Sequence, residues 1–127
     1  MSFNKAEKLK SRKLIENLFR EGKSVSVFPI KVLYGFVENL EVPLQAGVTA
    51  SSRRFKKAVE RNRIKRIMRE AYRLQKSPLQ QLLSDKHKSL VLFFIYLDRE
   101  LPLFAEVHQK MGVVLQKLVD HILKQPD

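Results

Sequence analysis

The sequence contains no cysteine, which excludes disulfide bonds, thiolate zinc sites and a cysteine nucleophile together. It also lacks a long apolar run. The longest, SLVLFFIYL at residues 89–97, is less than half of the roughly 20 residues that a membrane-spanning helix needs. The opening residues, MSFNKAEKLKSRK, have no apolar core of the kind that a signal peptide carries. We therefore expect a mature, cytoplasmic protein that has no membrane partner.

Groups suited to acid–base or metal chemistry are also few. The histidines, His87, His108 and His121, lie in unrelated contexts, and no histidine pair or His/Asp/Glu group has the spacing of metal ligands. Glu60 and Glu70 are separated along the basic segment and are better interpreted as partners of neighbouring arginines than as a catalytic pair. We expect no catalytic residue and no metal site among the protein side chains.

Length and composition predict one domain, residues 1–127, folded around its own core. A chain of 127 residues has the size of an ordinary domain, and 44% of its residues are hydrophobic. A chain of this length buries roughly two-thirds of its unfolded surface on folding, so no cross-link is required.

Positive charge is abundant and concentrated in one segment. The net charge is +12, and residues 53–73 carry ten basic and two acidic side chains, or +8. Residues 1–52 add +3 and residues 74–127 add +1. A concentrated positive field attracts a polyanion, most often nucleic acid, through phosphate contacts and counterion release. We therefore interpret residues 53–73 as a nucleic-acid contact surface; the alternative is a solvated face that only improves solubility.

The first predicted element is a helix from Lys8 to Glu21. Its apolar residues recur at helical spacing, Ser11 is a suitable N-cap, and Gly22 can end the helix.

Strands are predicted next. The segment VSVFPIKVLYGFVE, residues 25–38, is rich in β-branched and aromatic residues, and Pro29 should mark a break near its start. Alternation along this strand places Tyr34 on one side and Leu33 on the other. AGVTAS, residues 46–51, predicts a short second strand, and we expect these two strands to pair as a hairpin.

The second half of the chain predicts helix, strand and helix. A basic helix is followed by a polar, partly helical link, residues 75–88, and then by SLVLFFIYL, which has the length and composition of a strand buried on both faces. Pro102 suits the first turn of a last helix. The apolar stripe expected on that helix comprises Leu103, Val107, Met111, Val114, Leu118 and Ile122. The order α-β-β-α-β-α, with one more strand if residues 25–37 are split, predicts an α+β domain with helices against one small sheet.

On a helical wheel the basic helix has one apolar face and one cationic face. With Ile64 at 0° and 100° per residue, a buried stripe within about 80° is predicted. It comprises Ile64, Ile67, Met68, Ala71, Leu74 and Gln75. The opposite sector holds Asn62, Lys65, Arg66, Arg69 and Arg73, and Arg61 and Arg63 flank the stripe from opposite edges.

The residue types on the cationic face favour RNA recognition over a generic basic patch. Arginine predominates, and its planar fork makes bidentate contacts to phosphate and stacks on bases. Asn62 adds no charge, so it indicates a directed hydrogen bond, either to a base edge or to a neighbouring backbone group. Like charges at this spacing repel by a few tenths of a kcal/mol per pair, so the helix is most stable with a polyanion across it.

The segment KKAVERNRIKRIMREAYR, residues 56–73, resembles the signature helix of the bacterial ribonuclease P protein component, a small basic subunit that assists a catalytic RNA. The family pattern is Ala-Val, then Arg-Asn-Arg-x-Lys-Arg, then Arg-Glu. It matches Ala58, Val59, Arg61, Asn62, Arg63, Lys65, Arg66, Arg69 and Glu70. The resemblance extends over nearly the whole chain, through LFREG, KVLYGF, GVTASSRRFKK and SLVLFFIYL.

The fold implied by the resemblance is a small single-domain α–β sandwich of the ribosomal protein S5 domain 2-like class, with a left-handed βαβ crossover around the signature helix. That handedness is an exception to the right-handed rule and comes from the resemblance alone. The chain departs from the family at two places. It has no glycine before Ala58, and Ile15 stands where the family usually has an aromatic residue.

The function implied by the resemblance is that of the protein subunit of ribonuclease P, an endoribonuclease in which the RNA subunit carries the chemistry with Mg²⁺. The partners implied are the catalytic RNA and precursor tRNA, with no obligate protein partner. The implied contacts to the RNA subunit are Arg61, Asn62, Arg63, Lys65, Arg66, Arg69 and Arg73. The basic residues of the junction before the helix are Arg53, Arg54, Lys56 and Lys57.

The single-stranded 5′ leader of precursor tRNA would lie between the sheet and the first helix, against Ile15, Phe19 and Tyr34. Aromatic side chains beside cations suit a single strand, because every base has a stacking face and the backbone needs charge. The alternative for Phe19 and Tyr34 is an ordinary place in the core.

Two other functions compete with this one. A structural RNA-binding protein of similar fold, such as a ribosomal protein, would have the same charge and fold class. A DNA-binding basic helix would need a dimerisation heptad or a second recognition helix, and neither is evident.

Overall fold

A computed structural model describes residues 5–125, so the outermost residues of the expected 1–127 domain lie outside it. In chain order the elements are η1, a 3-10 helix (Lys5–Glu7), α1 (Arg12–Glu21), β1 (Lys23–Val27), β2 (Ile30–Val37), β3 (Leu44–Ala50), α2 (Ala58–Gln75), α3 (Ser77–Asp85), β4 (Ser89–Tyr96) and α4 (Phe104–Lys124). The predicted α+β class is confirmed, and the 25–37 region is split into two strands, with Pro29 at the break.

The four strands form one mixed sheet in the order β1-β2-β4-β3. β2 pairs antiparallel with β1 and with β4, whereas β3 pairs parallel with β4. α2 and α3 therefore form the crossover that joins the parallel strands β3 and β4.

The expected hairpin between the 25–38 strand and the AGVTAS strand is wrong. β2 forms its hairpin with β1, and β3 lies at the other edge of the sheet beyond β4. The reason is the apolar character of β4: its side chains are buried toward both faces, so this strand takes a central place between β2 and β3.

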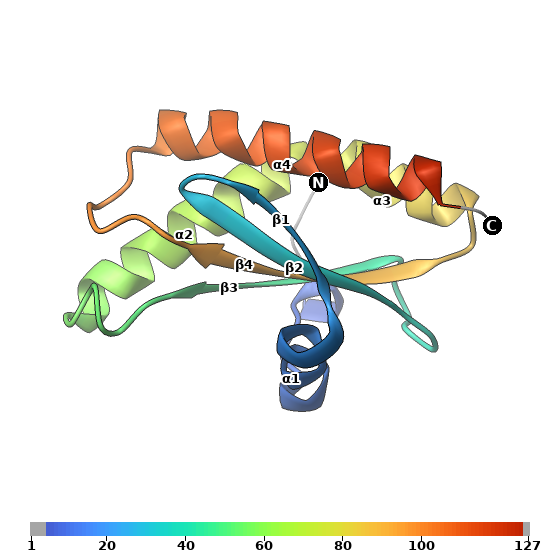
Figure 1. Cartoon of the computed structure of the whole chain (residues 1–127), viewed down its shortest axis with the longest axis horizontal. Coiled ribbons are helices and arrows are strands. Elements are labelled where there is room, and N and C mark those ends of the chain that lie inside the picture. The colour runs from blue at the N-terminus through green and yellow to red at the C-terminus, as the bar shows by residue number, and fades with distance from the viewer. Residues whose placement is uncertain (1–4, 126–127) are drawn as a thin grey trace.

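Helices cover the two faces of the sheet unequally, as Figure 1 shows: α2, α3 and α4 lie on one side and α1 lies alone on the other. The larger hydrophobic cluster lies between the sheet and α2–α4 and includes Ile64, Met68, Phe94 and Met111. The smaller cluster lies under α1 and includes Leu18, Leu33 and Val91. One face of the sheet is thus largely covered, although Phe36 at its end is 39% exposed, and much of the other face stays accessible.

α1 is shorter than predicted, because it begins at Arg12 and not at Lys8. The Ser11 hydroxyl accepts a hydrogen bond from the Leu14 amide at 3.2 Å, which confirms Ser11 as the N-cap. Gly22 ends the helix in extended backbone, and its amide donates to the Leu18 carbonyl at 3.0 Å. A Cβ at position 22 would lie 2.5 Å from that carbonyl oxygen, so the close approach requires glycine.

The basic helix α2 is rotated slightly from its predicted orientation. Ile64, Met68 and Ala71 are buried as expected, and Tyr72 is buried with them against Phe94, their ring centroids 5.4 Å apart. Leu74 was expected in the buried stripe but is 51% exposed. Tyr72 and Leu74 lie about 80° to either side of Ile64 on the wheel, and packing on Phe94 selects the tyrosine side.

In α4 the stripe from Val107 to Ile122 is buried as predicted. Its first member, Leu103, is the N-cap residue and is exposed, so its assignment to the buried stripe is wrong. Pro102 precedes the helix and is not part of its first turn.

A buried ion pair fixes the N-terminal segment to the helical layer. The Lys76 ammonium lies 2.8 Å from Glu7, and the Gln80 amide donates to the same carboxylate at 2.7 Å. Since Lys76 lies between α2 and α3, this cluster also fixes the end of the basic helix.

Candidate nucleic-acid interface

The outer face of α2 presents a row of three cations and one amide that is free to meet a ligand. Asn62, Arg66 and Arg69 are exposed and Lys65 is half-buried. Across residues 5–125, none of these four side chains makes a hydrogen bond or an ion pair. The other side of the helix is buried in the core, so the row is held on a rigid support.

Arg73 extends this row but is partly neutralised. Its Nε donates to Glu70 Oε2 at 3.1 Å, and its Nη2 donates to the second carboxylate oxygen. The hydrogen bond from Arg73 lowers the pKa of Glu70, and the same bond raises the pKa of Arg73. Both groups therefore stay charged over the whole neutral range, and Arg73 contributes less net field than its neighbours.

Lys8 lies beside this row, although nothing in the sequence predicts that the N-terminal segment is near α2. Together with Arg66, Arg69, Glu70 and Arg73, it lines a shallow groove of about 200 Å³. Lys8 is brought there by an isolated parallel bridge to Ala46 of β3. No local pattern signals such a contact, because it depends on the pairing of the N-terminal segment with the sheet edge.

The junction between β3 and α2 carries four exposed cations on an ordered loop. Arg53, Arg54, Lys56 and Lys57 all point to solvent, whereas the Phe55 side chain is buried. The Phe55 ring lies 6.1 Å from that of Tyr96, so the middle of the loop is anchored to the sheet.

Arg61 and Arg63 differ in environment. Arg63 is exposed, whereas Arg61 is half-buried and donates from Nη1 to the carbonyl oxygens of Phe55 at 2.6 Å and Lys56 at 2.9 Å. The sequence did not separate the roles of these two arginines.

A second surface lies between α1 and the accessible face of the sheet. The Phe19 ring is 60% exposed and meets Phe93 of β4 edge-on, their centroids 5.7 Å apart. Ile15 packs on the smaller hydrophobic cluster. In the neighbouring register row, Lys31 of β2 pairs with Ile95 of β4. This face thus combines apolar rings with a cation, and Phe93 and Lys31 are members that the sequence did not assign to a site.

Tyr34 is not part of that surface. It lies on the opposite face of the sheet, is only 3% exposed, and its hydroxyl lies 3.0 Å from Nδ1 of His121 on α4. Burial raises the pKa of Tyr34. The structure therefore brings Ile15 and Phe19 together but separates them from Tyr34, which takes the alternative place in the core.

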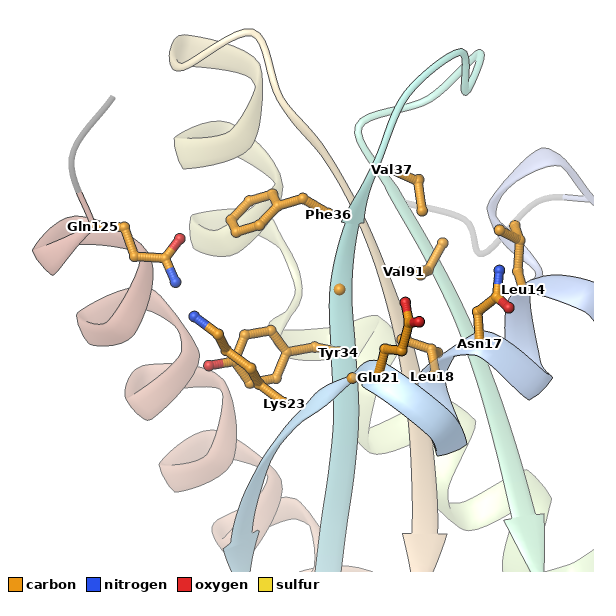
Figure 2. Close-up of a pocket in the computed structure, with 12 residues that line it drawn as sticks. Leu14, Asn17, Leu18, Glu21, Lys23, Tyr34, Phe36, Val37, Val91 and Gln125 are labelled. Carbon is orange, nitrogen blue, oxygen red and sulfur yellow. The ribbon is translucent and has the colours of Figure 1, made fainter.

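A pocket of about 630 Å³ opens beside β2, past the end of its pairing with β1. In Figure 2, Tyr34 and Phe36 point from β2 toward α4, whereas Asn17 and Leu18 approach from α1 on the other side. The pocket thus wraps around the strand and has no single chemical character.

Two further properties bear on function. Among residues 5–125, no group of three or more His, Cys, Asp or Glu side chains is arranged to hold a metal ion. In the same part of the chain, no helix is both long and apolar enough to cross a membrane.

Comparisons with known proteins agree on one family. Residues 3–119 match the family model described as Ribonuclease P. The chain is 34% identical over 120 residues to the ribonuclease P protein component of Porphyromonas gingivalis, covering 94% of this chain and 88% of the relative. It is 30% identical over 128 residues to that of Chlorobium phaeobacteroides, covering 92% and 88%.

Solved structures show the same fold. The ribonuclease P protein of Thermotoga maritima is similar with a TM-score of 0.68 at 23% identity, over 87% of this chain and 96% of that one. The protein from Staphylococcus aureus gives a TM-score of 0.68 at 21% identity, over 90% and 96%.

Proposed function

Since the chain belongs to the ribonuclease P protein component family, we propose that the outer face of α2 binds the catalytic RNA of ribonuclease P. The holoenzyme of this family is an endoribonuclease that matures tRNA, and membership decides against the ribosomal-protein-like alternative. The contacts that we assign to the RNA subunit are Asn62, Arg63, Lys65, Arg66, Arg69 and Arg73, together with the junction cations Arg53, Arg54, Lys56 and Lys57.

The observation that carries this proposal is the row of unpaired side chains on α2. A buried or paired arginine has its donors satisfied by the protein, but Arg66 and Arg69 leave their planar forks in solvent on a fixed support. Such forks suit bidentate contacts to phosphate oxygens. Arg61 is treated separately below, because its Nη1 is already bonded to backbone carbonyls.

We assign the 5′ leader of precursor tRNA to the surface between α1 and the open face of the sheet. Phe19 and Phe93 offer apolar rings to unstacked bases, and Lys31 offers charge to the backbone. Ile15 adds an apolar contact at the edge of this surface. Tyr34 is left out of the assignment because it belongs to the other face.

The chemistry belongs to the RNA subunit in this proposal. Mg²⁺ is the metal that the family's reaction uses, and the described residues provide no carboxylate cluster suited to holding it. In this proposal the protein supplies binding and orientation, and no side chain is assigned a catalytic role. We place the holoenzyme in the bacterial cytoplasm, where tRNA precursors are made, and assign it no obligate protein partner.

The experiment that tests this proposal is a salt titration of binding to the ribonuclease P RNA of the same organism. Replacing Arg66 and Arg69 by alanine should weaken binding and reduce the slope of log K against log[salt] by about two, since each lost phosphate contact removes about one. The matched control is Lys117→Ala with Lys124→Ala, which removes the same charge from exposed positions on α4. An equal reduction in both double variants would contradict a localised site, because it would mean that only the overall charge matters.

A further inference from the structure

The loop between β3 and α2 is ordered in spite of its charge. Four cations within residues 53–57 repel one another, which favours many spread conformations over one. Ser51 opposes this at the start of the loop. Its hydroxyl accepts hydrogen bonds from the amides of Arg53 at 3.2 Å and Arg54 at 3.4 Å, and its carbonyl accepts from Phe55 at 3.0 Å. The buried Phe55 ring then anchors the middle of the loop.

The end of the loop is held by Arg61. One guanidinium nitrogen donates to the carbonyls of Phe55 and Lys56, which precede the first helical residue, Ala58. On the wheel Arg61 lies about 60° from Ile64, inside the buried half of the helix, whereas Arg66 and Arg69 lie beyond 120°. Its direction and its bonds thus separate Arg61 from the exposed row.

The position of Arg61 would be unfavourable without these bonds. Arg61 lies close to the start of α2, where a cation opposes the positive end of the helix dipole. Glu60 is the acidic residue of the first turn, and the N-cap residue Lys57 makes no side-chain hydrogen bond to the helix. Two charge-assisted hydrogen bonds to carbonyl oxygens stabilise the guanidinium there.

We propose that Arg61 is a positioning residue that clamps the 51–57 loop so that Arg53 and Arg54 are preorganised for RNA, and that it does not itself contact the RNA. The proposal rests on the RNA-binding function assigned above. Preorganisation matters because ordering long side chains and loops on binding costs free energy and so lowers the affinity of the complex. Without the clamp the loop cations remain, but they no longer meet the phosphates from one fixed arrangement.

The test is a double-mutant cycle in binding to the ribonuclease P RNA. Arg61→Met should weaken binding roughly tenfold in the natural sequence, which corresponds to about 1.4 kcal/mol. It should have no effect once all four loop cations, Arg53, Arg54, Lys56 and Lys57, have been replaced by alanine, because the loop then carries no cation to position. An equal weakening in both backgrounds would overturn the proposal, since it would mean that Arg61 contacts the RNA directly.

Arg63→Met is the matched control. Arg63 is an exposed arginine two residues away whose side chain makes no hydrogen bond or ion pair among residues 5–125, so its effect should be the same in both backgrounds. Arg61→Lys keeps the charge on a shorter side chain and should lose nearly as much affinity as Arg61→Met. Full affinity in the lysine variant would overturn the clamp, because charge alone would then suffice.

Amide hydrogen exchange of the free protein provides a readout without RNA. In Arg61→Met the amides of Arg53, Arg54 and Phe55 should exchange faster, while those in the middle of α2 stay protected. Unchanged exchange in the loop would overturn the proposal.

If Arg66→Ala with Arg69→Ala leaves RNA binding unchanged while the loop exchange responds as expected, the proposed RNA interface has failed and the clamp has not.

Discussion

At the scale of single residues, Phe19 is an apolar side chain that leaves most of its surface in solvent. It is 60% exposed, and its contact with Phe93 is at the edge of the ring. Stacking of a base on an aromatic ring contributes roughly 1–3 kcal/mol. A ring held in this way on a rigid helix is therefore available to a base of a single strand.

We expect Phe19→Ala to lower the affinity of the holoenzyme for leader-bearing precursor tRNA by about tenfold, within the range of one lost stacking contact. The affinity for mature tRNA, which has no leader, should not change. Equilibrium binding of the two tRNAs measures the difference. Phe28→Ala is the control, because Phe28 is equally exposed at 62% but lies at the turn between β1 and β2. Equal losses for both tRNAs would show that Phe19 does not contact the leader.

The face of the sheet on which Tyr34 lies cannot be predicted from single residues. Alternation along β2 correctly separates Tyr34 from Leu33, but it does not say which face of the strand α1 covers. That choice is made by tertiary packing: Leu33 joins the cluster under α1, and Tyr34 faces α4 and bonds to His121. His121 is likewise found only through the fold, since it is far from Tyr34 along the chain.

At the scale of elements, the orientation of α2 determines which of its side chains stabilise the fold. Met68 is fully buried, so Met68→Ala should lower the free energy of unfolding by about 2–5 kcal/mol. Leu74 is 51% exposed, so Leu74→Ala should change it by no more than about 0.5 kcal/mol. Urea unfolding followed by circular dichroism at 222 nm measures both values. Similar losses in the two variants would mean that Leu74 is buried together with Met68, as the helical wheel predicts.

Much of α2 and β4 could be predicted from the sequence because their signals are local. The opposed faces of α2 follow from helical spacing, and an apolar run as long as β4 fits a strand buried on both sides. The pairing of β3 could not be predicted, because its pattern indicates a strand but does not identify a partner 46 positions later, as between Leu44 and Leu90. The bonds of Arg61 were missed for a related reason: backbone carbonyls of a loop leave no pattern in the residues.

At the scale of the whole molecule, the two hydrophobic clusters share one sheet. β4 contributes Leu92 and Phe94 to the larger cluster and Val91 to the smaller one. Because both clusters include residues of β4, the loss of this strand from the sheet would disrupt both.

We expect a single cooperative unfolding transition, as for a one-domain protein. The three tyrosines, Tyr34, Tyr72 and Tyr96, are all in the larger cluster, so near-ultraviolet circular dichroism reports on that cluster. Far-ultraviolet circular dichroism reports on all helices, including α1. The two signals should have the same midpoint in urea. Separate midpoints would contradict the assignment of the chain to one domain.

The parallel pairing of β3 with β4 has a consequence for the synthesis of the protein on the ribosome. At about 5–20 residues per second, the partner of β3 is made roughly 2–9 seconds after it. During that interval the apolar face of α2 has no completed sheet to cover it. The arginines on its other face give the nascent segment a strong like charge, which keeps such chains apart. We therefore expect the charge that we assign to RNA binding to protect the unfinished chain from aggregation as well.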